Sequence, residues 1–366
     1  MGSPTISVRT ASRRWRPLLA LGVGASLLVG CGGGGDDAGS AGGGGNGGSG
    51  GGSPDEVTFL NVVPIESLSF VTEMYAQCSG LFEEQNLEVR FEATQGSSQA
   101  INTVIAGSAL LTRIGDIETI SAIANQDAPL VNVGVHEKEG TIRIMSAEAD
   151  PLEKPEDFAG KLMGLPSVGG TSEQTLDLML SVNGIDKADV QRQVTGLAPG
   201  VFDLVDSGRI AGYIVSADTA ISLQAQRPNA VAMNPAEFMS GGSQLYATSK
   251  EQAEDPEKAD QVRRYLQAIA DASVFIQDDE ANDFQETLDC ITGDFEVAAA
   301  ENREAAVESL KLYVAGFMSE GRELLLQTNA DRWQTLYDEM VEAGLAPAGQ
   351  DPQEWLSTEF APEVSE

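Results

Sequence analysis

The chain has 366 residues, with 22 Lys and Arg against 56 Asp and Glu, which gives a formal net charge of −34. A surface this acidic repels phosphate backbones, so the composition excludes a nucleic-acid binder and argues against docking on anionic lipid through protein charge. Hydrophobic residues make up 42% of the sequence, which is enough for packed cores and excludes global disorder. The length suits two comparable lobes better than one small core.

Residues 1–30 have the features of a secretion signal. Several arginines precede an apolar stretch, residues 18–29, that is too short to span a bilayer as a stable helix. The stretch ends in Leu28-Val29-Gly30-Cys31, which resembles the lipobox of bacterial lipoproteins. The resemblance implies cleavage before Cys31 and acylation of its thiol and amino group, and each buried CH₂ of the acyl chains contributes about 0.8 kcal/mol of membrane binding. The alternative is an uncleaved anchor helix with a chance cysteine.

Residues 31–54 begin with Cys31 and continue as a segment rich in Gly, Ser, Asn and Asp. No residue from 32 to 53 is apolar and larger than Ala, so this segment has nothing to bury and should behave as a flexible tether.

Beyond Cys31, the sequence contains only Cys78 and Cys290, an even pair for an exported protein. The two residues could form a disulfide that closes a long loop. Two buried free thiols remain the alternative, because the sequence alone does not place the cysteines within bridging distance.

From residue 56 onward, β-rich runs alternate with segments of helical spacing. Strands are predicted at residues 56–63, 87–92, 110–115, 130–135, 141–145, 161–165, 210–215 and 231–233. Helical spacing alone recurs after Pro256, as in Val262, Tyr265, Leu266 and Ile269. The alternation indicates βαβ units on mainly parallel sheets. It predicts an α/β chain with residues 55–145 in lobe one, 146–240 in lobe two, and 241–366 returning to lobe one and ending in helices.

Three segments in this part of the chain resemble family motifs. Residues 80–89 are similar to "G-F-F-x-E-x-G-L-x-V", residues 152–164 to "P-x-D-L-x-G-K-x-V-G" and residues 204–212 to "A-L-x-S-G-x-I-D-A". These motifs occur in the solute-binding proteins of bacterial ABC importers of the alkanesulfonate and thiamine-pyrimidine-precursor type. Two departures lie near the expected cleft: Leu110-Leu111 and Ala211-Gly212 stand where the family usually has an acid.

The resemblance implies a two-lobed periplasmic-binding-protein type II fold. Each lobe would be a mostly parallel sheet flanked by helices, with the C-terminal helices packed on lobe one. The implied function is capture of a small solute in the cleft between the lobes and its delivery to the permease subunits of an ABC transporter. We expect a monomer without cofactor or metal, outside the cytoplasm, anchored through lipidated Cys31 in the periplasm or on the outer face of the cell membrane.

The candidate ligand-binding residues follow from the strand order. In open α/β sheets, ligands bind beyond the carboxyl ends of strands, where helix N-termini present free N–H groups, and two such lobes close on the ligand by hinge motion. The candidates are Glu66, Ser67, Gln95, Gly96, Ser97, Ser98, Asp116 and Glu118 in lobe one, and Gly170, Thr171, Ser172, Ser216 and Asp218 in lobe two. Each also has a purely structural alternative, as a helix cap or as a glycine needed for turn geometry.

The charge of these loops bears on the ligand. They contain several carboxylates and no Lys or Arg, although Arg113 lies close by. We therefore expect an amine-bearing or heterocyclic ligand, similar to a thiamine pyrimidine precursor. The alternative is a sulfonate, nitrate or similar anion held by helix N-termini alone.

A catalytic set is hard to assemble from this sequence. His136 is the only histidine, so no other His is present for a Ser-His-Asp triad or a His-rich metal site. Pyrimidine synthases are distant relatives with this fold, but their Cys-rich cluster is absent here. We predict a binder without catalytic residues, with an enzyme of the pyrimidine-synthase branch as the remaining alternative.

Overall fold

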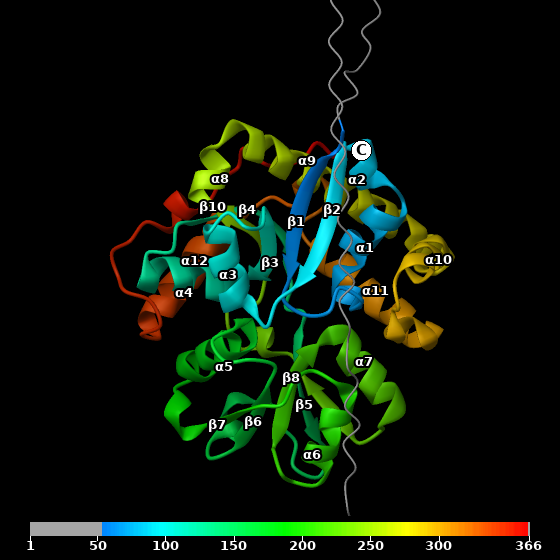
Figure 1. The fold of residues 1–366 in the computed structure, drawn as a ribbon. Helices are drawn as coiled ribbons and strands as arrows, with labels where there is room; N and C mark the ends of the chain where they lie inside the picture. Colours follow the sequence, from blue (N-terminus) through cyan, green and yellow to red (C-terminus); the bar gives the residue numbers. More distant parts are fainter. Residues whose placement is uncertain (1–52, 365–366) are drawn as a thin grey trace, which may run out of the picture. The chain divides into compact units, whose positions relative to one another are not determined.

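The computed structural model describes residues 53–364 of the chain. The predicted signal peptide, Cys31 and nearly all of the tether lie outside the described residues. Within them, two five-stranded sheets form the centres of two lobes (Figure 1). The described region contains no helix that is both long enough and apolar enough to cross a membrane.

The sheet of lobe one has the strand order β2-β1-β3-β10-β4. Its strands are β1 (Asp55–Asn61), β2 (Leu87–Ala93), β3 (Leu111–Gly115), β4 (Leu130–Glu137) and β10 (Gln244–Ser249). Strand β1 pairs in parallel with β2 and β3, whereas β10 runs antiparallel between β3 and β4. β3 and β4 are buried at every position, as expected for strands covered on both faces. β10 was not among the predicted strands, although Leu245-Tyr246-Ala247 is a short apolar run.

The sheet of lobe two has the order β7-β6-β8-β5-β9. Its strands are β5 (Ile142–Ala147), β6 (Leu162–Leu165), β7 (Gln191–Val194), β8 (Gly212–Ser216) and β9 (Ala230–Met233). β6 is parallel to β7 and β8, and β5 is antiparallel to β8 and β9. Because β5 belongs to this sheet, lobe two begins before residue 142, and the predicted placement of residues 141–145 at the end of lobe one needs correction.

Helices cover both sheets. In chain order the α-helices are α1 (Val71–Cys78), α2 (Leu81–Glu84), α3 (Ser97–Ile105), α4 (Asp116–Gln126), α5 (Thr171–Val182), α6 (Phe202–Asp206), α7 (Ala217–Gln226), α8 (Lys250–Glu254), α9 (Pro256–Asp279), α10 (Gln285–Asp294), α11 (Arg303–Phe317) and α12 (Ala330–Glu342). Short 3₁₀ turns are η1 (Leu68–Phe70), η2 (Pro155–Phe158), η3 (Lys187–Asp189), η4 (Pro199–Val201), η5 (Pro235–Glu237), η6 (Glu280–Asn282), η7 (Ala298–Glu301), η8 (Arg322–Leu324) and η9 (Pro352–Trp355).

The C-terminal helices complete the cores of lobe one, as predicted. The long helix α9 begins with Asp255 as N-cap and Pro256 at its first position, a favourable start. It buries Tyr265 and Ile269 in the same core as Phe59 of β1. On the other side of the sheet, α12 buries Trp333 against the core that contains α4. Figure 1 shows these yellow-to-red helices around the upper sheet.

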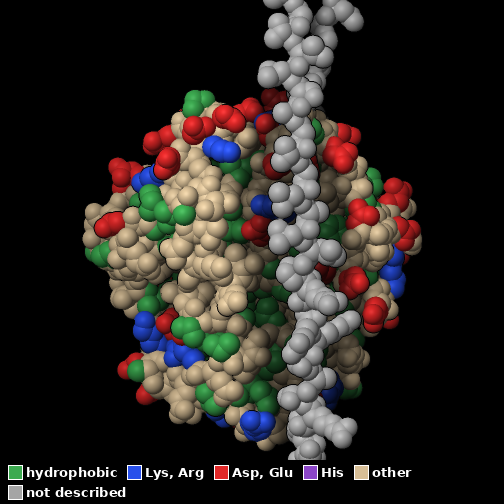
Figure 2. Space-filling view, viewed as in Figure 1, with side chains coloured by type: hydrophobic (Ala, Val, Ile, Leu, Met, Phe, Trp, Pro, Cys, Tyr) green, Lys and Arg blue, Asp and Glu red, His purple; other side chains and the backbone are tan. Residues whose placement is uncertain are grey.

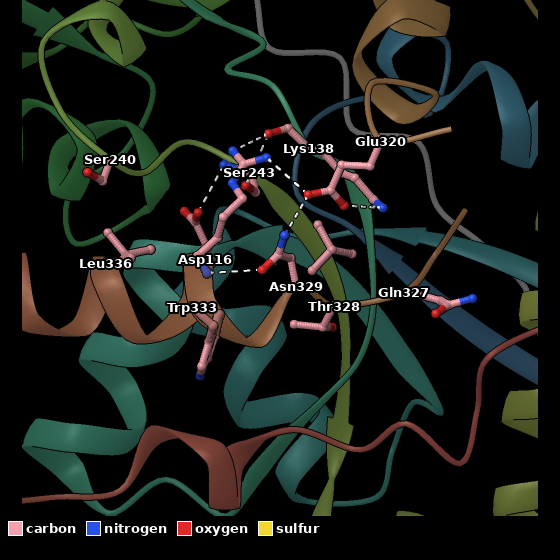
Figure 3. A pocket seen from close by; sticks show the side chains of 12 residues that line it. Asp116, Lys138, Ser240, Ser243, Glu320, Gln327, Thr328, Asn329, Trp333 and Leu336 are labelled. Atoms are coloured by element: carbon pink, nitrogen blue, oxygen red, sulfur yellow. Dashed lines mark hydrogen bonds and ion pairs between the residues drawn. The ribbon is translucent and has the colours of Figure 1, made fainter. Parts of the chain in front are cut away.

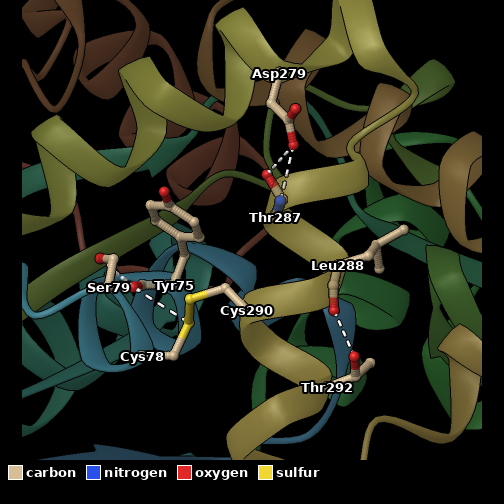
Figure 4. The surroundings of a disulfide bond; sticks show 8 residues. All are labelled: Tyr75, Cys78, Ser79, Asp279, Thr287, Leu288, Cys290 and Thr292. Atoms are coloured by element: carbon tan, nitrogen blue, oxygen red, sulfur yellow. Dashed lines mark hydrogen bonds between the residues drawn. A yellow bond between two sulfur atoms is a disulfide. The ribbon is translucent and has the colours of Figure 1, made fainter.

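A disulfide joins Cys78, at the end of α1, to Cys290 in α10 (Figure 4). Their Cα atoms are 5.8 Å apart, within the usual bridging range, and the bond spans 212 residues of sequence. Of the two possibilities that the sequence left open, the structure has the disulfide.

Candidate functional site

A cavity of about 80 Å³ lies between the two lobes. Its position agrees with the expected one, because loops at the carboxyl ends of β1, β2, β3, β6 and β8 surround it. The lining residues are Val62, Val63, Ser69, Phe70, Gly96, Ser97, Arg113, Ile114, Gly115, Thr141, Ile142, Pro166, Ser167, Thr171, Ser172, Leu197, Val215, Ser216 and Gln244. The wall is therefore made mainly of apolar side chains and hydroxyl groups.

Four helices begin at this cavity, and in three of them, α3, α5 and α7, no side chain accepts a hydrogen bond from the first N–H groups; in α4, Asp116 accepts from Ile117 N–H. The N-cap residues are Gly96 for α3, Gly170 for α5 and Ser216 for α7, and none of them caps its helix with a side-chain hydrogen bond. The first N–H groups of a helix have no partner within the helix, and they carry partial positive charge. The cavity thus combines an apolar wall with N–H donors suited to an anionic or strongly hydrogen-bond-accepting group.

The structure separates the predicted site residues into two groups. Gly96, Ser97, Thr171, Ser172 and Ser216 line the cavity. The others lie outside its lining, and they are Glu66, Ser67, Gln95, Ser98, Asp116, Glu118, Gly170 and Asp218.

Asp116 is bonded within lobe one. Its Oδ1 accepts hydrogen bonds from the N–H groups of Ile117 (2.7 Å) and Gly242 (3.1 Å), and its Oδ2 accepts one from Ser243 N–H (3.0 Å). Burial raises the pKa of Asp116, and these hydrogen bonds oppose the rise. The carboxylate thus holds the loop through which the chain returns from lobe two, close to the hinge.

Glu118 and Asp218 instead join the lobes. Oε2 of Glu118 accepts a hydrogen bond of 2.6 Å from Thr171 Oγ1 of lobe two. Asp218, at the start of α7 in lobe two, accepts hydrogen bonds from Ser67 Oγ (3.1 Å) and from the N–H of Leu68 (3.2 Å) in lobe one. Each of the predicted aspartates, and Glu118 as well, therefore has hydrogen-bond donors within the protein.

Arg113, noted in the sequence only as a neighbour of the loops, is the one charged residue in the cavity lining among the described residues. Its side chain is fully buried, with the guanidinium carbon 4.4 Å from the centre of the Phe70 ring. Burial lowers its pKa, but the acidic groups around it, first among them Glu73 (Oε1 3.6 Å from Nε) and then Tyr246, Glu137 and Tyr265, together outweigh that effect. The pKa of Arg113 is therefore raised. Its other partners are the backbone oxygen of Ser69 and Nδ1 of His136.

His136 is fully buried beneath this cavity. Burial holds its pKa well below the usual value, and Arg113 adds to the effect, so the ring is neutral near pH 7. Because Arg113 donates to Nδ1, the ring proton resides on Nε2, which lies 3.4 Å from Ser273 Oγ. His136 thus supports Arg113 in the core.

A second, smaller hollow of about 30 Å³ lies on the hinge side of lobe one (Figure 3). Lys138 and Glu320 form an ion pair at its edge (Nζ–Oε2 2.6 Å), and Arg332 donates a hydrogen bond of 2.7 Å to the backbone oxygen of Lys138. These contacts tie residues 138–141, the segment between β4 and β5 that connects the two lobes, to the loop after α11 and to α12. Over residues 53–364, no cluster of three or more His, Cys, Asp or Glu side chains could hold a metal ion.

Comparison with known proteins gives one family and several structural likenesses. The family model described as NMT1/THI5 like matches residues 67–281. A comparison with curated protein sequences finds no match.

Solved structures share the fold over most of the chain. The alkanesulfonate-binding protein SsuA from Xanthomonas axonopodis pv. citri, bound to MOPS, is 14% identical, with a TM-score of 0.62 over 84% of this chain and 99% of its own. The nitrate-binding protein NrtA from Synechocystis PCC 6803 is 12% identical (TM-score 0.59, 84% and 87% covered). A Candida albicans protein with the generic periplasmic binding protein fold is 14% identical (TM-score 0.60, 83% and 96% covered). The predicted two-lobed fold is thereby confirmed.

Proposed function

The chain belongs to the NMT1/THI5-like family, and from this premise we propose that it is the solute-binding component of an ABC importer. In this proposal it captures a small molecule between its lobes, outside the cytoplasm, and delivers it unchanged to the permease subunits. The observation that carries the proposal is the cavity between the lobes, where three helices begin without side-chain caps.

The ligand that this cavity suits best is a small organic acid. Its carboxylate, sulfonate or similar group would accept hydrogen bonds from the N–H groups at the starts of α3 and α5, and its body would contact apolar side chains such as Phe70 and Leu197. The prediction of an amine-bearing ligand depended on carboxylates in the loops. Asp116, Glu118 and Asp218 are bonded within the protein and lie outside the cavity lining, so the anionic alternative has better support.

The location of the protein belongs to the same proposal. Acylation of Cys31 would hold the chain at a membrane surface, and residues 32–53 would act as the tether between the membrane and the lobes. The acidic side chains spread over lobe one, visible in Figure 2, are consistent with attachment through lipid rather than through protein charge.

The test is a thermal-shift screen of the full chain against short alkanesulfonates, short carboxylates, nitrate, pyrimidines and small amines. A ligand that binds only the folded state raises the melting temperature in a concentration-dependent manner. We expect a shift with an organic acid, and mass spectrometry should recover that acid unchanged. A shift with amines alone would overturn the assigned ligand class, and conversion of the ligand would favour an enzyme of this fold.

A further inference from the structure

A side chain of lobe two inserts into a notch in lobe one. Thr171, the first residue of α5, lies against Gly115, Ser97 and Glu118. Its Oγ1 donates to Glu118 Oε2 (2.6 Å), accepts from Gly115 N–H (3.3 Å) and lies 3.4 Å from Ser97 Oγ. A hydroxyl group has one donor and two acceptor positions, so these contacts use its full capacity.

The notch depends on the glycine at position 115. A Cβ atom added to Gly115 would lie 2.3 Å from Thr171 Cγ2, a distance at which the Thr171 side chain or one of the lobes has to shift. The backbone of Gly115 is extended, with φ −72° and ψ 151°, so alanine fits its conformation and only the space is missing. The contact is therefore specific to the closed arrangement of the two lobes.

In this arrangement, few partners offset the cost of burying Glu118 as an ionised carboxylate. Its exposed fraction is 3%, and within the described part of the chain Oε1 has no hydrogen-bond partner. A buried carboxylate whose donors are neutral groups and which has no cation nearby is costly, and a protonated carboxyl in the same place costs less. When the lobes separate, Thr171 leaves and this side of Glu118 faces water.

The charged groups on the surrounding elements have other partners. Asp116 of α4 is bonded to backbone N–H groups, and Arg113 of β3 to Glu73 and His136. On α5, Glu173 accepts a hydrogen bond from Gly169 N–H, and Asp177 forms an ion pair with Arg192. On α12, Glu339 accepts a hydrogen bond from Ser240 N–H. Burial accordingly raises the pKa of Glu118 to about 7, with the hydroxyls of Thr171 and Ser97 opposing the rise.

We infer that closure of the lobes is coupled to uptake of a proton by Glu118, with Thr171 as the residue that seals this carboxyl from water. The inference rests on the proposed function, because there closure accompanies ligand capture. In the open state the carboxyl titrates near its ordinary value of about 4.5, so closure takes up a proton between about pH 4.5 and pH 7. Closure, and with it ligand affinity, strengthens as the pH falls through this range, by about tenfold or more from pH 7 to pH 5.

The experiment is a ligand-free titration of the full chain. Infrared difference spectra between the wild type and Glu118→Gln isolate the carbonyl band of protonated Glu118, and X-ray scattering of the same samples reports the radius of gyration. We expect a midpoint near pH 7 in the wild type. Gly115→Ala should move the lobes apart, raise the radius of gyration and shift the midpoint by at least one pH unit toward the ordinary value.

The rescue variant is Gly115→Ala combined with Thr171→Ser, which removes the closest clashing atom and keeps the hydroxyl. It should restore the midpoint and the compact shape at least in part. A wild-type midpoint equal to that of Gly115→Ala, or a midpoint that does not follow the radius of gyration, would overturn the inference. Because no ligand is added, a failed ligand screen would affect the proposed function and leave this result standing.

Discussion

Tyr313 of α11 donates a hydrogen bond of 3.0 Å from its phenolic oxygen to Oδ1 of Asp218, which lies at the start of α7 in the opposite lobe. Oδ2 of the same carboxylate accepts from Ser67 Oγ and from Leu68 N–H. One buried side chain of lobe two thus holds both a C-terminal helix and the first turn after β1 in lobe one. This contact lies on a different side of the cavity from the Thr171 notch, so the lobes are joined at two places.

Replacing Asp218 should weaken the junction between the lobes. Asp218→Ala leaves Tyr313, Ser67 and the N–H of Leu68 without their acceptor, and a typical intramolecular hydrogen bond contributes about 0.5–1.5 kcal/mol net. We expect the free energy of unfolding to fall by about 2–4 kcal/mol, measured by urea denaturation. Tyr313→Phe, which removes one of the donors, should cost about 1 kcal/mol. Equal stability of Asp218→Ala and the wild type would contradict this role.

The Cys78–Cys290 disulfide should contribute strongly to the stability of lobe one. It connects α1 to α10 across 212 residues, and cross-links that close long loops restrict the unfolded chain most. Cys78→Ser/Cys290→Ser should lower the free energy of unfolding by about 2–5 kcal/mol, and a reductant should reproduce the loss in the wild type. The reductant should leave the melting temperature of the double variant unchanged. A wild type that is insensitive to complete reduction would count against this account.

The sequence was informative where structure follows from local patterns. The spacing of Val262, Tyr265 and Ile269 predicted α9, and the alternation of strands and helices predicted the two lobes. The sequence was less informative where the structure of a segment depends on which other segment it pairs with. β5 was assigned to the wrong lobe because pairing is set by tertiary contacts, and β7 was missed because its residues are largely exposed and polar.

The same limit explains what happened to the candidate site. The helix N-termini that follow strands could be predicted from the sequence, and Ser97, Thr171 and Ser216 at three of them line the cavity. The hydrogen-bond partners of the carboxylates could not be predicted, because Asp116 accepts hydrogen bonds from N–H groups of residues more than a hundred positions away. A loop that contains an acid therefore does not imply an acid that faces the ligand.

Stability should fall as the pH rises above neutrality because of Glu137. This residue is buried on β4, with Arg113, Glu73 and His136 as its charged or titratable neighbours, and burial raises its pKa to about 8. The folded state then holds a proton that the unfolded state releases above about pH 4.5, so the stabilising contribution is lost as the pH rises toward 8. Below about pH 6.5 the buried neutral His136 has the opposite effect, since the unfolded state binds the extra proton there.

The range best suited to the measurement is therefore pH 7 to 8, where Glu118 is already half or more ionised and Glu137 releases the larger share of the protons on unfolding. We expect the free energy of unfolding to fall by up to about 1.4 kcal/mol per pH unit, the value for one proton. Glu137→Gln, which cannot ionise, should flatten the profile, whereas Glu118→Gln should leave most of the decline. Urea midpoints at several pH values would measure this, and an equal slope in Glu137→Gln would show that another group is responsible.

The sign of the ligand's charge can be tested at Ser172, the second residue of α5, which lines the cavity. A carboxylate placed there by Ser172→Glu repels an anion bound at the helix start, and charges about 4 Å apart in a partly buried site interact by up to about 4 kcal/mol. We expect Ser172→Glu to weaken binding of an organic acid by about tenfold or more relative to Ser172→Gln, which has nearly the same size without the charge. Calorimetric titration with the acid identified by thermal shift measures both variants. Equal affinity of the two variants for the acid would contradict binding of its anionic group at this helix start. Tighter binding of a small amine to Ser172→Glu would return the amine hypothesis to first place, because only a positive group gains from a carboxylate at that position.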